Sequence, residues 1–245
     1  MERDINKYAT DYLNDRVESI YVKYRRRKVL EILNQYKPKR ILEIGCGTEP
    51  IFEYYKDYEK YTIIEPSEVF CKTVASLEDF NDRIHLICGF LESEADKLQN
   101  ESYDFILLSG LLHEVLDPDL LLERVHQLAR ANTIVHINVP NAESFHHLWA
   151  YEAGLVKSIY ELSSTAKSFQ RQSIFGMQSL RKIVSEHHFQ VLSEGSYFIK
   201  LFNNVKFEQV MKENLIDDNL LDALYSMTKY FPQNGAEIFV NCKIQ

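Results

Sequence analysis

Residues 40–50, RILEIGCGTEP, constrain the fold of this chain more than any other stretch. The mainly apolar run 41–44 has the length of a buried strand, and Gly45 and Gly47 follow it as a tight turn. Pro50 predicts the first position of a helix. Buried strands of this kind belong to parallel sheets covered by helices, and such sheets bind ligands at the carboxyl ends of their strands. Glycines at that edge let the backbone approach a ligand closely.

Strand-like and helix-like stretches alternate along the rest of the chain. Runs rich in apolar and β-branched residues predict strands at 40–44, 60–65, 84–89, 103–109, 133–139, 189–199 and 237–242. Apolar residues at helical spacing predict helices at 1–36, 50–56, 67–79, 91–102, 117–131 and 177–187, and within 203–230. Asp117 is a predicted N-cap. The alternation predicts an α/β fold with a parallel sheet and right-handed crossovers.

Residues 1–245 form one predicted domain, because no internal repeat or low-complexity linker interrupts them. Within it we expect an N-terminal helical cap at 1–36, a ligand-binding core at 37–140, and C-terminal strands and helices at 176–245. Residues 141–175 are too long for a bare connection in a compact domain. We therefore expect a helical lid inserted there, after the fifth strand.

The net charge of −8 opposes a nucleic-acid backbone as the main partner. The basic run 25–28 is short and typical of a solvated helix face, with an anion site as the alternative. No apolar run approaches the ~18–20 residues that span a bilayer, so no membrane partner is predicted. The amino terminus lacks a signal-peptide pattern. These features together predict a cytoplasmic protein.

The four cysteines, Cys46, Cys71, Cys88 and Cys242, show no paired spacing. Their spacing predicts neither a disulfide framework nor a zinc site. Cys46 and Cys88 lie at the ends of predicted strands, where we expect small buried thiols. A reducing compartment agrees with this pattern. No compact pair of acids follows the fifth strand, so no metal ligand is predicted.

The glycine turn at 45–47 matches neither of two common phosphate-binding signatures. Only Gly45 and Gly47 fit a G-x-G-x-x-G pattern, and no Gly-Lys-Ser/Thr follows them. Glu49 near the helix start would repel an anion. The turn therefore points to a ligand whose nearby charge is positive or zwitterionic.

Glu65 ends the second predicted strand, some twenty residues past the glycines. A carboxylate at this position can accept hydrogen bonds from both ribose hydroxyls of a nucleoside. Two bonds to a charged acceptor in a sheltered site contribute ~3 kcal/mol or more. The alternative is an ordinary turn carboxylate at a strand end.

Four short segments together resemble the class I S-adenosylmethionine-dependent methyltransferases. They are 42–48 (LEIGCGT), 64–67 (IEPS), 103–107 (YDFIL) and 112–116 (LHEVL). The resemblance extends over about residues 38–142 and, more loosely, to the last strand. It implies a Rossmann-like, seven-stranded, mostly parallel sheet with an antiparallel last strand and helices on both faces.

The resemblance also implies S-adenosylmethionine as the cofactor and a binding site at the strand ends. The implied cofactor residues are Glu43, Gly45, Cys46, Gly47, Glu65, Pro66, Gly89, Phe90, Leu91, Ser109, Gly110 and Leu111. Glu43 would brace the glycine turn and Glu65 would bind the ribose. Glu49 and Phe90 depart from the family pattern, which often has a glycine and an aspartate there. An arginine of the first helix, Arg16 or one of the run 25–27, is a candidate partner for the cofactor carboxylate.

Three histidines are candidate general bases, because a hydroxyl acceptor must lose its proton during methyl transfer. His113 follows the fourth strand by one turn, and packing against the cofactor is its alternative role. His146 and His147 lie in the expected lid, where surface or packing roles are the alternative. Asn138 at the end of the fifth strand either orients an acceptor oxygen or caps the turn.

The acceptor expected from the sequence is a small polar molecule, most simply a hydroxyl of a sugar or nucleotide-linked sugar. Trp149 and Tyr160 could stack on a sugar ring or form lid core. Segments 197–200 and 230–241 look similar to methyltransferases encoded with bacterial surface-polysaccharide genes. The alternatives are an N-methyltransferase and a nicotinamide-dependent oxidoreductase on a related fold. A homodimer stays open as a further partner.

Overall fold

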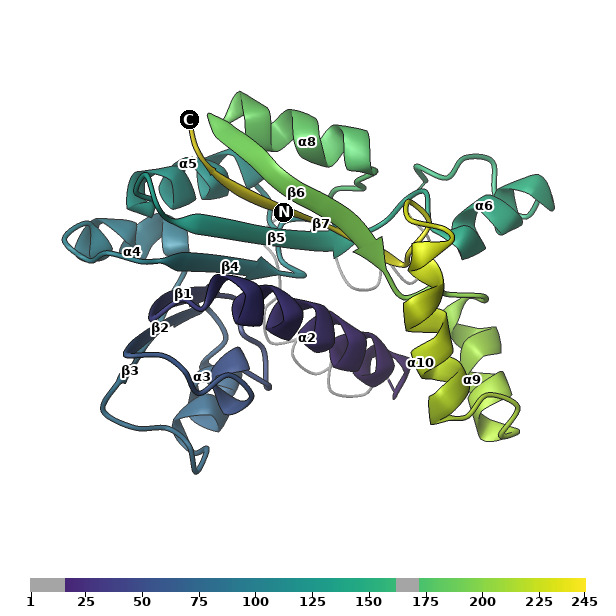
Figure 1. The fold of residues 1–245 in the computed structure, drawn as a ribbon, viewed down its shortest axis with the longest axis horizontal. Helices are drawn as coiled ribbons and strands as arrows, with labels where there is room; N and C mark the ends of the chain where they lie inside the picture. Colours follow the sequence, from purple (N-terminus) through teal and green to yellow (C-terminus); the bar gives the residue numbers. More distant parts are fainter. Residues whose placement is uncertain (1–15, 162–171) are drawn as a thin grey trace.

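One seven-stranded sheet organises the chain in this computed structural model, which describes residues 16–161 and 172–245. Its strands are β1 (Arg40–Ile44), β2 (Lys60–Glu65), β3 (Ile84–Cys88), β4 (Phe105–Ser109), β5 (Ile134–Pro140), β6 (Phe189–Tyr197) and β7 (Glu237–Ile244). They lie in the order β3-β2-β1-β4-β5-β7-β6 (Figure 1). Strands β1 to β5 pair in parallel, whereas β7 pairs antiparallel with β5 and β6. The expected mostly parallel sheet with an antiparallel last strand is confirmed.

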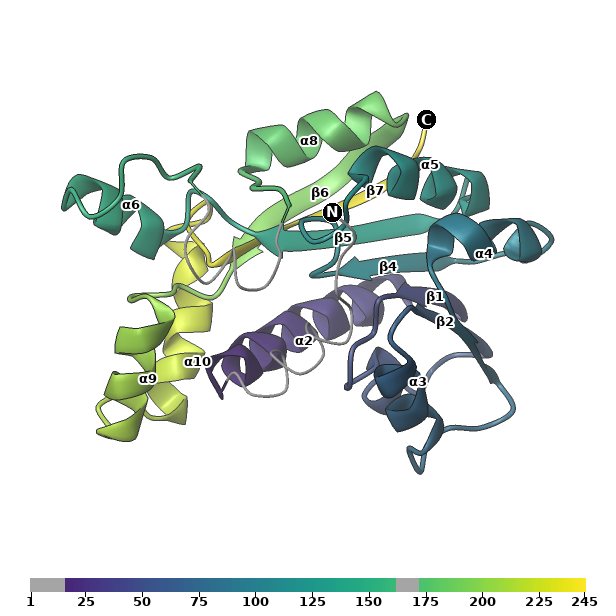
Figure 2. The same ribbon diagram turned by 180° about the vertical axis from the view of Figure 1, so that it is seen from behind.

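Helices cover both faces of the sheet (Figures 1 and 2). They are α2 (Arg16–Tyr36), α3 (Glu68–Ala75), α4 (Leu91–Leu98), α5 (Pro118–Leu128), α6 (Phe145–Glu152), α8 (Met177–Glu186), α9 (Asn204–Lys212) and α10 (Asp218–Ser226). Helices α4, α5 and α8 lie on one face and α2 and α3 on the other. The side chain of Asp117 accepts a hydrogen bond from Leu120 N and caps α5, as predicted.

Alternation along the strands divides the core into two layers, one on each face of the sheet. On β1, Leu42 and Ile44 face the layer that α4, α5 and α8 complete. Ile41 faces the opposite layer, together with Val29 of α2 and Val74 of α3. The carboxyl end of β1 is therefore fixed by packing on both of its faces.

A third, largely aromatic cluster holds the amino-terminal half of α2 against the last part of the chain. The ring of Tyr24 stacks on Phe198 at 4.6 Å and on Tyr225 at 5.5 Å between centroids. Phe207 of α9 and Leu221 of α10 complete this cluster. This packing holds α2 in position, so that its other residues can face the carboxyl ends of the strands.

The prediction of a helix at 50–56 is wrong, because the chain forms only a 3₁₀ turn there, η1 (Ile51–Glu53). Pro50 precedes this turn in an extended conformation and does not occupy a first helical position. A 3₁₀ turn brings positions three apart onto one face. Phe52 and Tyr55 have this spacing and both are buried. The turn ends at Tyr54, whose N–H donates to Ile51 O at 3.0 Å, and the two buried rings attach the segment to the core.

Three other helices are shorter than expected and end at Ala75, Leu98 and Leu128. At the end of α3 the hydroxyl of Ser76 donates a hydrogen bond to Thr73 O. In the expected lid, α6 lies within the described residues, whereas 162–171 lie outside them. Residues 1–15 of the expected helical cap also lie outside the described part.

Cys71 and Cys88 form a disulfide, which contradicts the expectation from their spacing. Cys71 lies on α3 and Cys88 ends β3, so the crossover between β2 and β3 brings their Cα atoms to 6.2 Å. Residues 17 apart meet here because of the tertiary fold, and their spacing carries no sign of it. Cys88 is also exposed to solvent, so the prediction of a buried thiol at this position is wrong.

Candidate functional site

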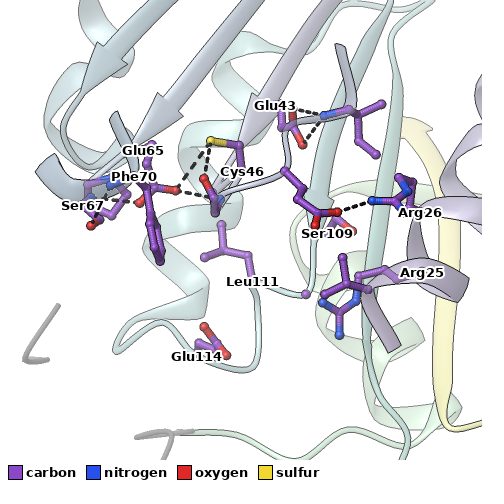
Figure 3. Close-up of a pocket in the computed structure, with 17 residues that line it drawn as sticks. Arg25, Arg26, Glu43, Cys46, Glu65, Ser67, Phe70, Ser109, Leu111 and Glu114 are labelled. Carbon is purple, nitrogen blue, oxygen red and sulfur yellow. Dashed lines mark hydrogen bonds and ion pairs between the residues drawn. The ribbon is translucent and has the colours of Figure 1, made fainter. Parts of the chain in front are cut away.

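A pocket opens at the carboxyl ends of β1, β2 and β4, where the glycine turn predicted a ligand (Figure 3). Nine of the twelve implied cofactor residues line it: Glu43, Gly45, Cys46, Gly47, Glu65, Pro66, Ser109, Gly110 and Leu111. Figure 3 shows Glu65, Ser67 and Phe70 on one side and Arg25 and Arg26 on the other. We call this the cofactor pocket.

The remaining three implied residues, Gly89, Phe90 and Leu91, are not among those that line the cofactor pocket. Leu91 is buried in the core against α5 and β4 neighbours, and Phe90 is 51% exposed. Gly89 N donates a hydrogen bond to Glu65 O at 3.0 Å, so this segment is attached to the end of β2. A role for these residues toward adenine stays a prediction.

Three glycines of the pocket, Gly45, Gly47 and Gly110, need conformations that other residues adopt only with strain. Gly45 and Gly110 have φ angles of +74° and +68°. A Cβ atom on Gly45 would lie 3.3 Å from Leu111, and one on Gly110 would lie 3.2 Å from the guanidinium of Arg25. The close approach of these loops leaves their backbone as the floor of the pocket.

Glu65 joins the end of β2 to the glycine turn through both of its carboxylate oxygens. One oxygen accepts a hydrogen bond from Ser67 N at 2.9 Å, and the other accepts one from Gly47 N at 3.2 Å. The carboxylate is 4% exposed and points into the pocket (Figure 3). The carboxylate therefore holds the glycine turn by a hydrogen bond and also faces the position expected for a ribose.

Glu43 braces the glycine turn from beneath. Its carboxyl accepts hydrogen bonds from Tyr61 Oη at 2.7 Å and from Ile51 N at 3.1 Å. Burial raises the pKa of Glu43 to about 7, although both of these hydrogen bonds act to lower it. A carboxyl that is only partly ionised near neutral pH thus underlies the pocket.

The charge of the lining fits a cationic cofactor. Four carboxyl groups line the pocket, those of Glu43, Glu49, Glu65 and Glu114. The carboxyl groups outnumber the two arginines of the lining, Arg25 and Arg26. S-adenosylmethionine carries a sulfonium and an ammonium against one carboxylate, so it is a net cation that such a lining attracts more than a pyrophosphate. The chemistry of these side chains therefore fits S-adenosylmethionine.

The two arginines of the lining come from α2, whose run 25–27 held candidate partners for the cofactor carboxylate, and that role stays a prediction for Arg25. Its side chain is only 14% exposed, so it does not belong to a solvated helix face. Its Nε donates to both oxygens of Glu237 at 3.0 and 3.1 Å, and its Nη2 donates to Glu18 at 3.2 Å. Arg26 pairs with Glu49 at the pocket rim.

A second cavity, of about 540 Å³, adjoins the cofactor pocket and shares Arg25 with it. We call it the acceptor cavity. All three predicted candidate bases, His113, His146 and His147, line it. Its walls come largely from α6 and from the segment that enters α9. Trp149 and Phe202 contribute rings whose centroids lie 5.7 Å apart.

The three histidines have different surroundings. Nε2 of His113 lies 3.6 Å from the carboxylate of Glu114, and both side chains are buried. Nδ1 of His146 lies 3.0 Å from Ser144 Oγ, and burial followed by the charge of Lys200 places the pKa of His146 well below its usual range. Nδ1 of His147 lies 3.3 Å from Ala142 O. Because these contacts differ, the three imidazoles are expected to differ in how readily they accept a proton.

Asn138 caps a turn and does not line either cavity. Its Oδ1 accepts a hydrogen bond from Gly110 N at 2.9 Å, and its Nδ2 donates to Ser109 Oγ at 3.0 Å. The side chain is fully buried. It holds the loop after β4 against β5, which is the second of the two roles considered for it.

Sequence reasoning missed Glu114, which lines the cofactor pocket next to a histidine that lines the acceptor cavity. Its position in the quoted segment LHEVL was the available signal. Phe70, in the first turn of α3, was missed as well, because an apolar residue at helical spacing reads as core.

Within the described residues, no helix has both the length and the hydropathy needed to cross a membrane. Across that same part of the chain, no group of three or more His, Cys, Asp or Glu side chains could hold a metal ion.

Residues 21–194, more than half of the chain, match a family model described as a methyltransferase domain. A comparison with curated proteins finds no match.

Three solved structures illustrate the shared fold. A possible histamine N-methyltransferase from Thermotoga maritima has 16% identity and a TM-score of 0.62, over 98% of this chain and 99% of that one. A putative S-adenosylmethionine-dependent methyltransferase from Listeria monocytogenes has 12% identity and a TM-score of 0.61, over 93% and 99%. The 1,6-didemethyltoxoflavin-N1-methyltransferase of Burkholderia thailandensis, solved with S-adenosylhomocysteine bound, has 12% identity and a TM-score of 0.58, over 98% and 88%.

Structures with such low sequence identity show only that the fold is shared. The assignment to a family therefore rests on the match to the methyltransferase domain. That match also decides against the nicotinamide-dependent oxidoreductase, in agreement with the acidic lining of the cofactor pocket. The chain belongs to the class I S-adenosylmethionine-dependent methyltransferases, and S-adenosylmethionine is its cofactor.

Proposed function

We propose that this enzyme methylates a hydroxyl of a small, ring-bearing polar acceptor, such as a sugar or nucleotide-linked sugar, with His113 as the general base. One observation carries the proposal. The adjacent residues His113 and Glu114 divide between the two sites, His113 lining the acceptor cavity and Glu114 the cofactor pocket. His113 therefore lies where the two ligands would meet.

The residues of the chain mainly align the reactants. The cofactor, when bound, supplies a methyl group that its sulfonium has already activated. Alignment of two bound reactants contributes ~7–11 kcal/mol to the barrier reduction. Gly45 and Gly110 provide closely approaching backbone for one ligand, and Arg25 forms a wall between the two sites. His113 accepts the proton that the hydroxyl loses.

Glu114 favours His113 over the other two histidines as the base. The carboxylate of Glu114 lies 3.6 Å from Nε2 of His113, where it can stabilise the positive charge that the imidazole gains when it takes the hydroxyl proton. For His146 the opposite holds, because its surroundings disfavour protonation. Nδ1 of His147 contacts the uncharged backbone carbonyl of Ala142, which stabilises an imidazolium less than a carboxylate does.

The lining of the acceptor cavity supports a ring with polar substituents. Its volume lies within the ~300–1,000 Å³ typical of small-molecule sites. The half-exposed indole of Trp149 offers a flat apolar face to a ring. Lys200 and Asn204 supply polar groups on the wall at the start of α9. A sugar with a free hydroxyl combines these features.

The test is a methyl-transfer assay over candidate sugars and sugar nucleotides, with His113→Ala beside the wild type. We expect kcat to fall about 10²–10⁴-fold, because the hydroxyl proton then lacks a positioned acceptor. The dissociation constant of S-adenosylhomocysteine should change little, since His113 lines the other cavity. His147→Ala serves as the control within the same cavity. A kcat unchanged in His113→Ala would remove His113 as the base.

An amine acceptor is the second candidate, since three carboxylates line the acceptor cavity and only two of them, Glu18 and Glu237, pair with Arg25, which leaves Glu161 as a partner for an ammonium group. Two of the similar structures are described as an N-methyltransferase or a possible one. An amine needs little help from a base. Retention of most of the rate in His113→Ala, with an amine as substrate, would favour this candidate.

A further inference from the structure

The Cys71–Cys88 disulfide lies against the part of the cofactor pocket that faces Glu65. Cys71 directly follows Phe70, whose ring lines the pocket. Cys88 is the residue of β3 that pairs with Glu65 in the sheet. The sulfur of Cys71 lies 3.2 Å from the carbonyl oxygen of Glu65. Both cysteines therefore contact the residue expected to bind the ribose.

The disulfide joins an edge strand of the sheet to a short helix. In the described sheet β3 is an edge strand and pairs only with β2. Helix α3 is eight residues long, and its amino terminus is capped by Ser67, another residue of the pocket lining. The bond thus ties the end of an edge strand to the short helix that carries Phe70.

The two sulfurs differ in their access to solvent. Residue Cys88 is exposed to solvent, whereas Cys71 is buried, with only 4% of its surface exposed. Thiol–disulfide exchange with an external molecule requires access to the attacking sulfur. Exchange would therefore start at Cys88 and finish at Cys71.

We propose that Cys71 and Cys88 form a reversible redox site that sets the affinity of the enzyme for its cofactor, with the disulfide form binding more tightly. The oxidant is a small-molecule disulfide such as glutathione disulfide. The Cys88 thiolate attacks it, forms a mixed disulfide and releases one glutathione thiolate. The Cys71 thiolate then attacks the Cys88 sulfur, forms the internal disulfide and releases the second glutathione. Two protein thiols are oxidised and one glutathione disulfide is reduced.

The direction of the effect follows from preorganisation. The disulfide holds Phe70, Ser67 and the backbone of Glu65 in one arrangement before the cofactor binds. In the dithiol form this wall has to be ordered during binding, and ordering side chains weakens affinity. We expect the dissociation constant of S-adenosylhomocysteine to rise about three- to tenfold on reduction. The inference depends on cofactor binding and is independent of the identity of the acceptor.

The experiment measures the dissociation constant of S-adenosylhomocysteine by calorimetry on oxidised and reduced protein. Oxidised protein is prepared with glutathione disulfide and selected by mass as the form without a glutathione adduct, so that Cys46 in the pocket is unmodified. Alkylation followed by peptide mass spectrometry identifies which cysteines are bonded. Tighter binding by the oxidised protein supports the proposal.

Cys88→Ser is the matched variant. Cys88 is exposed to solvent, so the substitution removes the disulfide partner of Cys71 without disturbing the core. We expect this variant to bind S-adenosylhomocysteine like the reduced wild type, both with and without oxidant. Equal or weaker binding by the oxidised wild type would overturn the proposal. Failure of Cys71 and Cys88 to bond in a glutathione disulfide buffer would overturn it as well.

Discussion

At the scale of single residues, the buried carboxyl of Glu43 links the pocket to pH. Its pKa is raised to about 7 from the value of 4.5 that applies without the fold, chiefly by burial. Between these two values the folded chain holds a proton that the unfolded chain has released. Protein stability attributable to Glu43 therefore falls as the pH rises through this window and is fully present below it.

Glu43→Gln is expected to remove this dependence, because an amide can still accept the hydrogen bonds of Tyr61 and Ile51 but does not titrate. The wild type should lose free energy of unfolding relative to the variant as the pH rises from about 5 to about 7.5, by at most about 1.4 kcal/mol per unit of pKa shift. Urea unfolding of both proteins at the two pH values measures the difference, and all other groups cancel. Parallel behaviour of the two proteins would contradict the assignment.

Gly110 and Gly47 allow backbone strain to be separated from steric contact. Both have positive φ, +68° and +60°, so alanine at either position is strained by about 1–2 kcal/mol. A Cβ on Gly110 would also lie 3.2 Å from Arg25, whereas one on Gly47 meets nothing within 4 Å. We expect Gly110→Ala to lower the free energy of unfolding more than Gly47→Ala does. Equal losses in chemical denaturation would show that Arg25 yields without cost.

At the scale of elements, the strands were predictable because their signals are local. Each parallel strand is a short apolar run that ends at a glycine, proline or acid, as Ile44 before Gly45 does. The helix predicted at 50–56 is wrong, and the buried rings of Phe52 and Tyr55 show that contacts with the core hold this segment. Patterns along the chain carry no such information about what a turn packs against.

The candidate site was predictable to a similar degree and for the same reason. Residues at strand ends, such as Gly45 and Glu65, take their place from the sheet itself. Arg25 does not, because its inward orientation depends on Glu237, which lies 212 residues away. The Cys71–Cys88 bond likewise depends on the crossover that brings α3 beside β3.

Helix α6 offers a test of the acceptor cavity at the scale of one element. Trp149 lines the cavity, whereas the comparably exposed Tyr151 on the same helix does not. We expect Trp149→Ala to raise the KM of a ring-bearing acceptor roughly three- to tenfold, through loss of ring contact. Tyr151→Ala should leave KM unchanged, and neither variant should alter the binding of S-adenosylhomocysteine. Similar KM values for the two variants would place the acceptor elsewhere.

At the scale of the whole molecule, the disulfide constrains the unfolded chain. Its cysteines are 17 residues apart, and closing a loop of this size stabilises a fold by about 3 kcal/mol. Reduction, or Cys88→Ser, should lower the free energy of unfolding by about that amount. Chemical denaturation with and without reductant measures it, and Cys88→Ser should show no response to reductant. A response of the variant equal to that of the wild type would place the effect on another group.

The cytoplasmic location and the homodimer stay predictions from the sequence. A reducing compartment would keep most structural disulfides open. A bond between Cys71 and Cys88 in such a compartment would therefore report the local redox state, which connects the location of the enzyme to its cofactor affinity. Sedimentation of the purified chain over a range of concentrations would measure the oligomeric state.

Arg25 touches both the cofactor pocket and the acceptor cavity, and this shared wall has a thermodynamic consequence. A ligand that shifts the guanidinium from one side changes the shape and charge that the other ligand meets. Coupling between two binding equilibria is reciprocal, so each ligand must change the affinity of the other by the same factor. One side chain, held in place by Glu18 and Glu237, would then couple the affinity for the cofactor to the affinity for the acceptor.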